Sequence, residues 1–120
     1  MKTILIADDK LPGRELLRTV LESSGYTVLE TENGEEAVRE ARLHRPDLII
    51  LDLHMPELDG FDVIRQLRTE AEFALTPIVA LTASAMQGDR ERALAAGFTG
   101  YLTKPIRLSD LRLEVERLLR

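Results

Sequence analysis

A chain of 120 residues is long enough to bury one hydrophobic core and too short for several domains. It contains no cysteine, which excludes disulfides, thiolate metal sites and thiolate nucleophiles and suits a reducing, cytoplasmic compartment. With 21 acidic residues against 16 basic ones the net charge is −5, which argues against direct binding to nucleic acid, and no apolar run is long enough for membrane insertion.

Short apolar runs alternate along the chain with apolar residues at helical spacing. Runs of four or five apolar residues bounded by turn signals are typical of strands buried on both faces. Proline, asparagine and glycine mark where the helices begin and end. In chain order, the pattern predicts strand Thr3–Ala7, a helix from Pro12 to Gly25, strand Tyr26–Glu30, a helix from a capping Asn33 to just before Pro46, strand Leu48–Leu51, a helix from Phe61 to about Glu72, strand Ile78–Leu81, helix Asp89–Ala96, strand Phe98–Leu102 and a terminal helix over Leu108–Leu118.

The alternation of five strands with five helices predicts an α/β fold in one domain, residues 1–120. The sheet should be parallel and doubly wound, a (βα)5 unit with helices on both faces. In the flavodoxin-like strand order 2-1-3-4-5, the first and third strands are neighbours, and a crevice opens beyond their carboxyl ends. The informative residues are therefore those that end each strand.

Chemically useful side chains follow four of these strands. Three carboxylates that converge on one crevice repel each other unless a cation joins them. An all-oxygen site with room for water suits Mg²⁺, for which Mn²⁺ can substitute. The strand-end residues are Asp8, Asp9, Asp52, Thr82 and Lys104.

Together these groups suit phosphoryl transfer. A carboxylate can act as a nucleophile and form an acyl phosphate, while a cation, an ammonium and a hydroxyl neutralise the transferred group. Each residue alone has an ordinary structural explanation, since aspartate caps helices and lysine is usually solvated. Four strand ends that each supply a group needed by one reaction favour the chemical explanation.

The motifs resemble the receiver domain of two-component response regulators, the CheY-like family. The resemblance covers essentially the whole chain and lies in the acidic pair, Asp-x-x-Met-Pro-x-x-x-Gly ending at Gly60, Thr-Ala and Lys-Pro. It implies that Asp52 accepts a phosphoryl group from a histidine kinase or a histidine phosphotransfer protein. It also implies that Asp9, Asp52 and the backbone carbonyl of His54 bind Mg²⁺ directly, with Asp8 holding it through water.

The resemblance assigns further roles around the acceptor. Lys104 would contact the phosphoryl group and precede a cis peptide bond at Pro105, and Thr82 with Tyr101 would form the switch pair. His54 and Ser84 occupy positions that tune the lifetime of the phosphoryl group. Lys10 departs from the small polar residue that many relatives carry there, and its charge either lowers Mg²⁺ affinity or merely faces solvent.

The expected function is a phosphoacceptor switch that catalyses only its own phosphorylation and dephosphorylation. A downstream protein effector would read the face formed by the fourth helix, the fifth strand and the fifth helix. An aspartyl phosphatase is disfavoured because His54 stands where such enzymes place a second aspartate. A phosphorylation-independent interaction domain and a receiver excised from a hybrid histidine kinase or multidomain regulator are the remaining alternatives.

Overall fold

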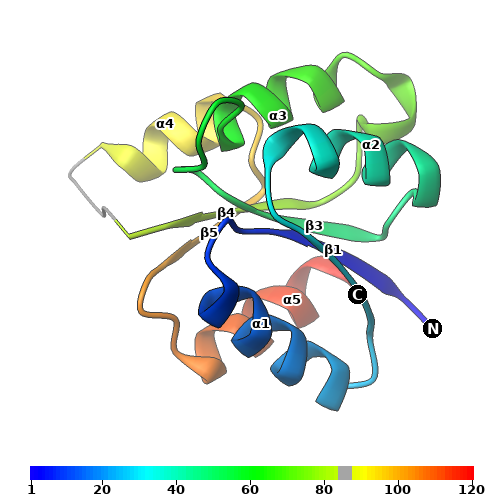
Figure 1. Ribbon diagram of the computed structural model, residues 1–120, viewed down its shortest axis with the longest axis vertical. Coiled ribbons are helices and arrows are strands. Elements are labelled where there is room, and N and C mark those ends of the chain that lie inside the picture. The colour runs from blue at the N-terminus through cyan, green and yellow to red at the C-terminus, as the bar shows by residue number, and fades with distance from the viewer. Residues whose placement is uncertain (84–87) are drawn as a thin grey trace.

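The computed structural model describes residues 1–83 and 88–120, and it confirms a parallel five-stranded sheet in the order β2-β1-β3-β4-β5 (Figure 1). All four strand pairs are parallel. The elements are β1 (Thr3–Ala7), α1 (Leu11–Ser23), β2 (Thr27–Thr31), α2 (Gly34–His44), β3 (Leu48–Asp52), α3 (Gly60–Arg68), the 3₁₀ turn η1 (Ala71–Phe73), β4 (Ile78–Thr82), α4 (Asp89–Ala95), β5 (Gly100–Thr103) and α5 (Leu108–Leu118).

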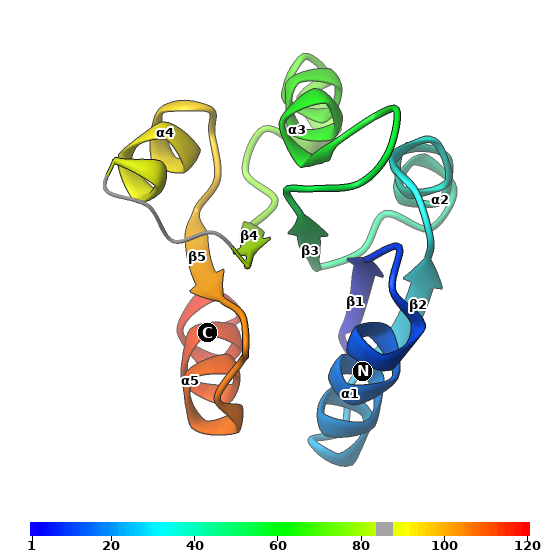
Figure 2. The same ribbon diagram turned by 60° about the vertical axis from the view of Figure 1, so that its left-hand side comes forward.

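The helices form two layers around the sheet. Helices α1 and α5 cover one face, and α2, α3 and α4 cover the other (Figures 1 and 2). Because parallel crossovers are right-handed, the strand order must reverse for helices to reach both faces, and it reverses between β1 and β3. Within residues 1–83 and 88–120, no helix has both the length and the apolar character needed to span a membrane.

Each face of the sheet carries its own hydrophobic core. Side chains alternate along a strand, so Leu5 packs toward α2 and α3 whereas Ile4 and Ile6 pack toward α1 and α5. All five residues of β3 and all five of β4 are buried. This two-sided burial explains why the central strands are continuous apolar runs in the sequence.

Two strands begin later than their sequence pattern predicts, β2 by one residue and β5 by two, and each extends one residue further at its carboxyl end. In both cases the first residue of the predicted strand is hydrogen-bonded to the last turn of the preceding helix. The N–H of Tyr26 donates to the carbonyl of Leu21, and that of Phe98 donates to the carbonyl of Ala93. Closing the last helical turn therefore takes precedence over extending the strand.

Among the described residues, side-chain caps begin two helices, α2 and α3. The predicted cap of α2 is present, because Asn33 Oδ1 accepts the N–H of Glu36 at 2.8 Å. The Glu36 carboxylate, however, accepts the N–H of Glu32 and not that of Asn33. A complete capping box occurs instead at α3, where Asp59 and Asp62 each accept the other's N–H.

Helix α3 ends at Arg68 and not near Glu72, because Glu70 adopts an extended backbone with φ −99° and ψ 128°. The half-buried Arg68 side chain then turns toward the loops that follow α3 and α4. Its guanidinium donates hydrogen bonds to the carbonyls of Phe73, Thr76 and Gly97. Arg68 thus joins the loop after α3 to the loop after α4, where its acceptor Gly97 lies 29 residues further along the sequence.

We expect Arg68→Met to lower the free energy of unfolding by about 1–3 kcal/mol, because it leaves several carbonyls without their donor. Urea unfolding followed by circular dichroism measures this change. The matched control is Arg65→Met on the same helix, which removes an exposed ion pair with Asp62 at 3.2 Å and should cost less than about 0.5 kcal/mol. Equal losses of unfolding free energy in the two variants would contradict a stabilising role for the Arg68 hydrogen bonds.

Candidate functional site

The carboxyl ends of β1, β3, β4 and β5 bring the predicted residues to one edge of the sheet. Asp8 and Asp9 follow β1, Asp52 ends β3 and is paired in register with Leu81 of β4, and Thr82 ends β4. Lys104 follows β5 directly. Parallel strands all end at the same edge, so the strand order alone makes these groups neighbours.

The acidic residues form a compact cluster. One carboxylate oxygen from each of Asp8, Asp9 and Asp52 lies within 4.8 Å of the others. Asp8 is fully buried and Asp52 is 3% exposed. Unpartnered carboxylates are costly at such depth, so a positive charge must compensate them.

Lys104 supplies that charge by contacting two of the three carboxylates. Its Nζ lies 3.0 Å from Asp8 Oδ2 and 2.9 Å from Asp52 Oδ2. Burial opposes the charged ammonium, but its hydrogen bonds to Asp52 and Asp8 outweigh burial and raise the pKa of Lys104. Lys104 is therefore a cation throughout the physiological pH range. The peptide bond from Lys104 to Pro105 is cis.

Both oxygens of Asp52 have partners. Oδ1 accepts the backbone N–H of His54 at 2.8 Å, and Oδ2 faces Lys104. Burial raises the pKa of the Asp52 carboxyl and the neighbouring Asp8 charge adds to this, whereas Lys104 and the His54 N–H act in the opposite direction. The side chain of His54 is exposed, so it lies at the mouth of the site and not within the cluster.

Two glycines allow the backbone to pass close to the acidic residues. A Cβ atom on Gly60 would lie 2.7 Å from the carbonyl oxygen of Asp52, and one on Gly13 would lie 2.8 Å from Asp8 Oδ2. Either contact is shorter than real Cβ atoms tolerate, so a larger residue at Gly60 would displace the backbone at Asp52, and one at Gly13 would displace the Asp8 carboxylate.

The predicted switch residues occupy adjacent strands. Thr82 is fully buried at the end of β4, and Tyr101 on β5 is partly exposed and paired in register with Ala80. Burial raises the pKa of the Tyr101 phenol, with a further contribution from the charge of Asp89 at the start of α4. Ser84 lies outside the described residues.

The cluster fits a hard divalent cation. Asp9 Oδ1 is buried and, within residues 1–83 and 88–120, has no hydrogen-bond partner, so one acceptor oxygen of the cluster lacks a donor. The surrounding side-chain ligands are carboxylate oxygens, which Mg²⁺ and Mn²⁺ prefer. Lys10 contributes its backbone N–H to Asp8 Oδ1 at 2.9 Å, and the residue as a whole is exposed.

Sequence reasoning missed Arg14. Its guanidinium is buried, and Nη1 donates to the main-chain carbonyl of Asp8 at 2.8 Å. The signal was present, because Arg14, Leu17 and Leu21 share the inner face of α1 at helical spacing. A charged residue on an apolar face indicates a buried partner.

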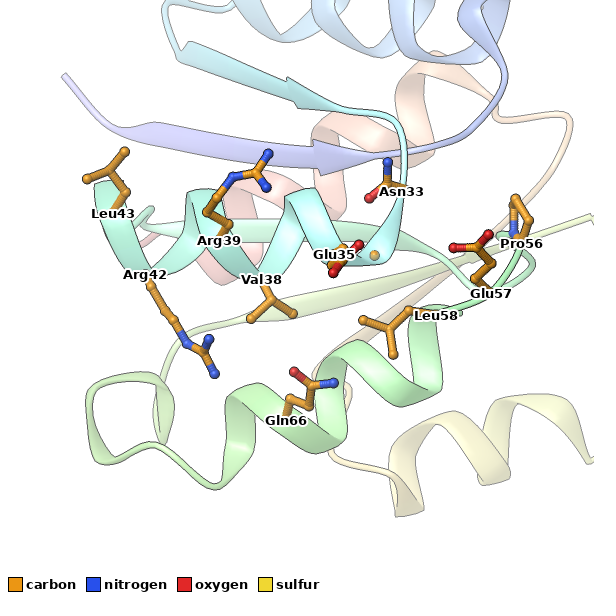
Figure 3. A pocket seen from close by; sticks show the side chains of 11 residues that line it. Asn33, Glu35, Val38, Arg39, Arg42, Leu43, Pro56, Glu57, Leu58 and Gln66 are labelled. Carbon is orange, nitrogen blue, oxygen red and sulfur yellow. The ribbon is translucent and has the colours of Figure 1, made fainter.

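Hollows on the surface do not single out the site by size. One of about 500 Å³ borders it and is lined by Asp8, Lys104, Pro105 and residues of α1. A larger one, of about 990 Å³, lies between α2, α3 and the loop after β3, around Val38, Leu58 and Arg42 (Figure 3). Of the predicted site residues that the structure describes, none lines the larger hollow.

Known proteins share both the sequence and this architecture. The response regulator receiver domain family matches residues 4–116. The polar-differentiation response regulator DivK of Brucella anthropi is 42% identical over 105 residues, 88% of this chain and 85% of that protein. Chemotaxis protein CheY4 of Vibrio cholerae has a TM-score of 0.93 at 32% identity, covering 99% of both chains. The receiver domain of sensor histidine kinase PA1611 from Pseudomonas aeruginosa PAO1, with a magnesium ion coordinated in its active site cleft, has a TM-score of 0.91 at 37% identity, covering 98% of this chain and 97% of that one.

We expect Mg²⁺ to stabilise the protein and Asp9→Asn to remove this effect. A ligand that binds only the folded state adds about 2.7 kcal/mol at a hundredfold excess over its dissociation constant. In chelator, Asp9→Asn should be at least as stable as the wild type, because it removes one of three clustered negative charges and Asp9 Oδ1 has no hydrogen-bond partner among the described residues to lose. Thermal unfolding with Mg²⁺ or with chelator measures both effects.

The control for the comparison between wild type and Asp9→Asn is Asp110→Asn, which removes an exposed carboxylate in the first turn of α5. It should retain the full stabilisation by Mg²⁺. A wild type that gains nothing from Mg²⁺, or an Asp9→Asn variant that gains as much, would contradict the assignment of the cation to this cluster.

Proposed function

The chain belongs to the response regulator receiver domain family of two-component systems, and on that basis we propose that Asp52 accepts a phosphoryl group from a histidine of a partner protein. The observation that carries the proposal is the buried Asp52 carboxylate, held between the Lys104 ammonium and two further carboxylates. The phosphodonor would be a histidine kinase or a histidine phosphotransfer protein.

The transfer needs one bond to form and one to break. An oxygen of Asp52 attacks the phosphorus, the P–N bond to the donor imidazole breaks, and the released nitrogen keeps the electron pair and is protonated as needed from solvent. Lys104 already lies 2.9 Å from Asp52 Oδ2, so its charge is in place to neutralise the arriving phosphoryl oxygens. Asp8, Asp9, Asp52 and the main-chain carbonyl of His54 would hold Mg²⁺, which supplies further charge neutralisation when bound.

The response to phosphorylation would involve Thr82, Tyr101 and α4. A phosphoryl group shifts a conformational equilibrium only if the two states bind it differently, and a Thr82 hydroxyl that turns toward it would provide that difference. Helix α4 is lightly anchored: Ala93 is its only buried residue among the described ones, and Gly88 and Gly97 at its ends have φ values of 91° and 108°. Such an element is suited to move.

We propose that a downstream protein effector binds the face formed by α4, β5 and α5, and that the domain works in the cytoplasm without contacting nucleic acid directly. Its catalysis is limited to its own phosphorylation and dephosphorylation. His54 is exposed beside the acceptor and would influence how water reaches the acyl phosphate. Ser84, two residues after Thr82 in the sequence, would have a corresponding role.

Asp52→Asn should abolish phosphorylation and leave the fold intact. Intact mass after incubation with acetyl phosphate and Mg²⁺ should show one hydroxylamine-labile phosphoryl adduct in the wild type and none in the variant or in chelator. Asp110→Asn, with an exposed carboxylate, is the matched control and should label normally. If acetyl phosphate does not phosphorylate the wild type, the labelling is repeated with phosphorylated histidine kinases as donors. Labelling retained in Asp52→Asn would assign the acceptor elsewhere.

Lys104→Ala should still accept some phosphoryl groups but lose the response of the effector face, because the group that holds the phosphoryl oxygens is gone. Hydrogen exchange in residues 88–118, compared with and without phosphorylation, measures that response. Lys10→Ala is the control, since it removes an ammonium near the cluster from an exposed residue that contacts Asp8 through its backbone N–H, which alanine retains. An unchanged response in Lys104→Ala would remove Lys104 from the switch.

A further inference from the structure

Arg14 is a buried cation that the phosphoryl-transfer chemistry does not itself require. It lies in the first turns of α1 with a side chain that is 10% exposed, and its Nη1 donates to the carbonyl oxygen of Asp8 at 2.8 Å. Burying a guanidinium is costly unless it is paired and hydrogen-bonded. The contact with Asp8 therefore needs an explanation beyond packing.

The carbonyl that Arg14 holds belongs to the peptide unit that joins Asp8 to Asp9. A peptide unit is planar, so fixing its carbonyl fixes the rotation of the backbone between the two acids. The other side of Asp8 is held as well, because its N–H donates to the carbonyl of Thr31 at 3.2 Å. The directions in which the two carboxylates leave the chain are thereby set by α1 and β2.

Glu30 at the end of β2 neutralises and orients Arg14. Arg14 Nε lies 3.4 Å from Glu30 Oε1, an ion pair without the geometry of a directed hydrogen bond, since Nε has no hydrogen-bond partner among the described residues. The other oxygen of Glu30 lies 2.7 Å from Arg18 Nη1. Glu30 thus keeps a cationic partner even without Arg14.

We propose that Arg14, oriented by Glu30, is a positioning residue for the divalent cation site: it holds the Asp8–Asp9 peptide unit so that both carboxylates face the cation. This inference rests on the cation site of the proposed function. Arg14 itself touches neither the cation nor the phosphoryl group.

A purely electrostatic role and a positioning role for Arg14 predict opposite changes in cation affinity when Arg14 is replaced. Loss of a positive charge near three carboxylates would, through charge alone, tighten cation binding. Loss of a positioning contact would weaken it by about tenfold or more, as is usual for residues that orient metal ligands. The sign of the change therefore separates the two explanations.

The experiment measures the Mg²⁺ dissociation constant by isothermal titration calorimetry for the wild type, Arg14→Met and Arg18→Gln. Arg18→Gln is the matched control, because it removes an equal charge from the same Glu30 without contacting Asp8. We expect about tenfold weaker binding in Arg14→Met and a change of less than about twofold in Arg18→Gln. Unchanged or tighter binding in Arg14→Met would overturn the proposal, as would equal weakening in both variants.

A purely structural role would lower the melting temperature without changing cation affinity below it. Circular dichroism therefore accompanies each titration. If Arg14→Met does not fold, Arg14→Lys takes its place with the same expected sign, because lysine lacks the planar, forked guanidinium that reaches the Asp8 carbonyl with Nη1 and Glu30 with Nε. Labelling by acetyl phosphate gives a second test: Arg14→Met should raise the half-saturating Mg²⁺ concentration more than it lowers the rate at saturation.

The wild type separates failure of this inference from failure of the proposed function. A wild type that binds no Mg²⁺ would overturn the cation site and the inference together. A wild type that binds Mg²⁺ and is phosphorylated at Asp52, beside an Arg14→Met variant of equal affinity, would overturn the inference alone.

Discussion

The contact of Lys104 with two buried carboxylates is the interaction on which the site depends. It joins residues that are 96 and 52 positions apart in the sequence, and it exists only because the strands end at the same edge of the sheet. Lys104 follows β5 and reaches past the end of β4 to Asp52 and Asp8. Without this ammonium, the buried acids would face one another uncompensated, and the protein would have to protonate or expose them.

Such a cluster is a poor source of stability. The desolvation cost of burying an ion pair nearly cancels the attraction between its charges, and proteins with apolar residues in its place are often at least as stable. The two apolar cores on either face of the sheet supply the stability instead, with the fully buried strands β3 and β4 between them. The edge of the sheet can therefore hold charged groups that serve the chemistry of the site and add little to stability.

The structure is anchored unevenly, in a way that suits a switch. Arg14, Glu30 and Thr31 fix the acidic pair from α1 and β2, and Arg68 fixes the loops behind α3 and α4. Helix α4, by contrast, buries little and also contacts α3 through Arg92, whose guanidinium lies 4.8 Å from the centre of the Phe61 ring. Rigid support for the site and light support for α4 would let a local charge change alter one surface without disturbing the acceptor.

The sequence by itself determined the elements and the chemical groups. Apolar runs and helical spacing identified the five strands and the five α-helices but not the 3₁₀ turn η1, and the acids, hydroxyl and lysine at strand ends identified the site, because local periodicity and turn residues are encoded in neighbouring positions. The strand order was not encoded locally and came with the family resemblance. Helix and strand ends shifted where tertiary contacts competed, as at Glu70 and Tyr26.

Only the tertiary structure decided which distant groups touch. The ion pairs of Lys104, the buried guanidinium of Arg14 against the Asp8 carbonyl and the unpartnered oxygen of Asp9 depend on side-chain directions across separate elements. Sequence spacing gives the face on which a residue lies but not the partner that it meets there. Arg14 was therefore visible in the sequence as a charge on an apolar face, and its partner became known only when α1, β1 and β2 were packed together.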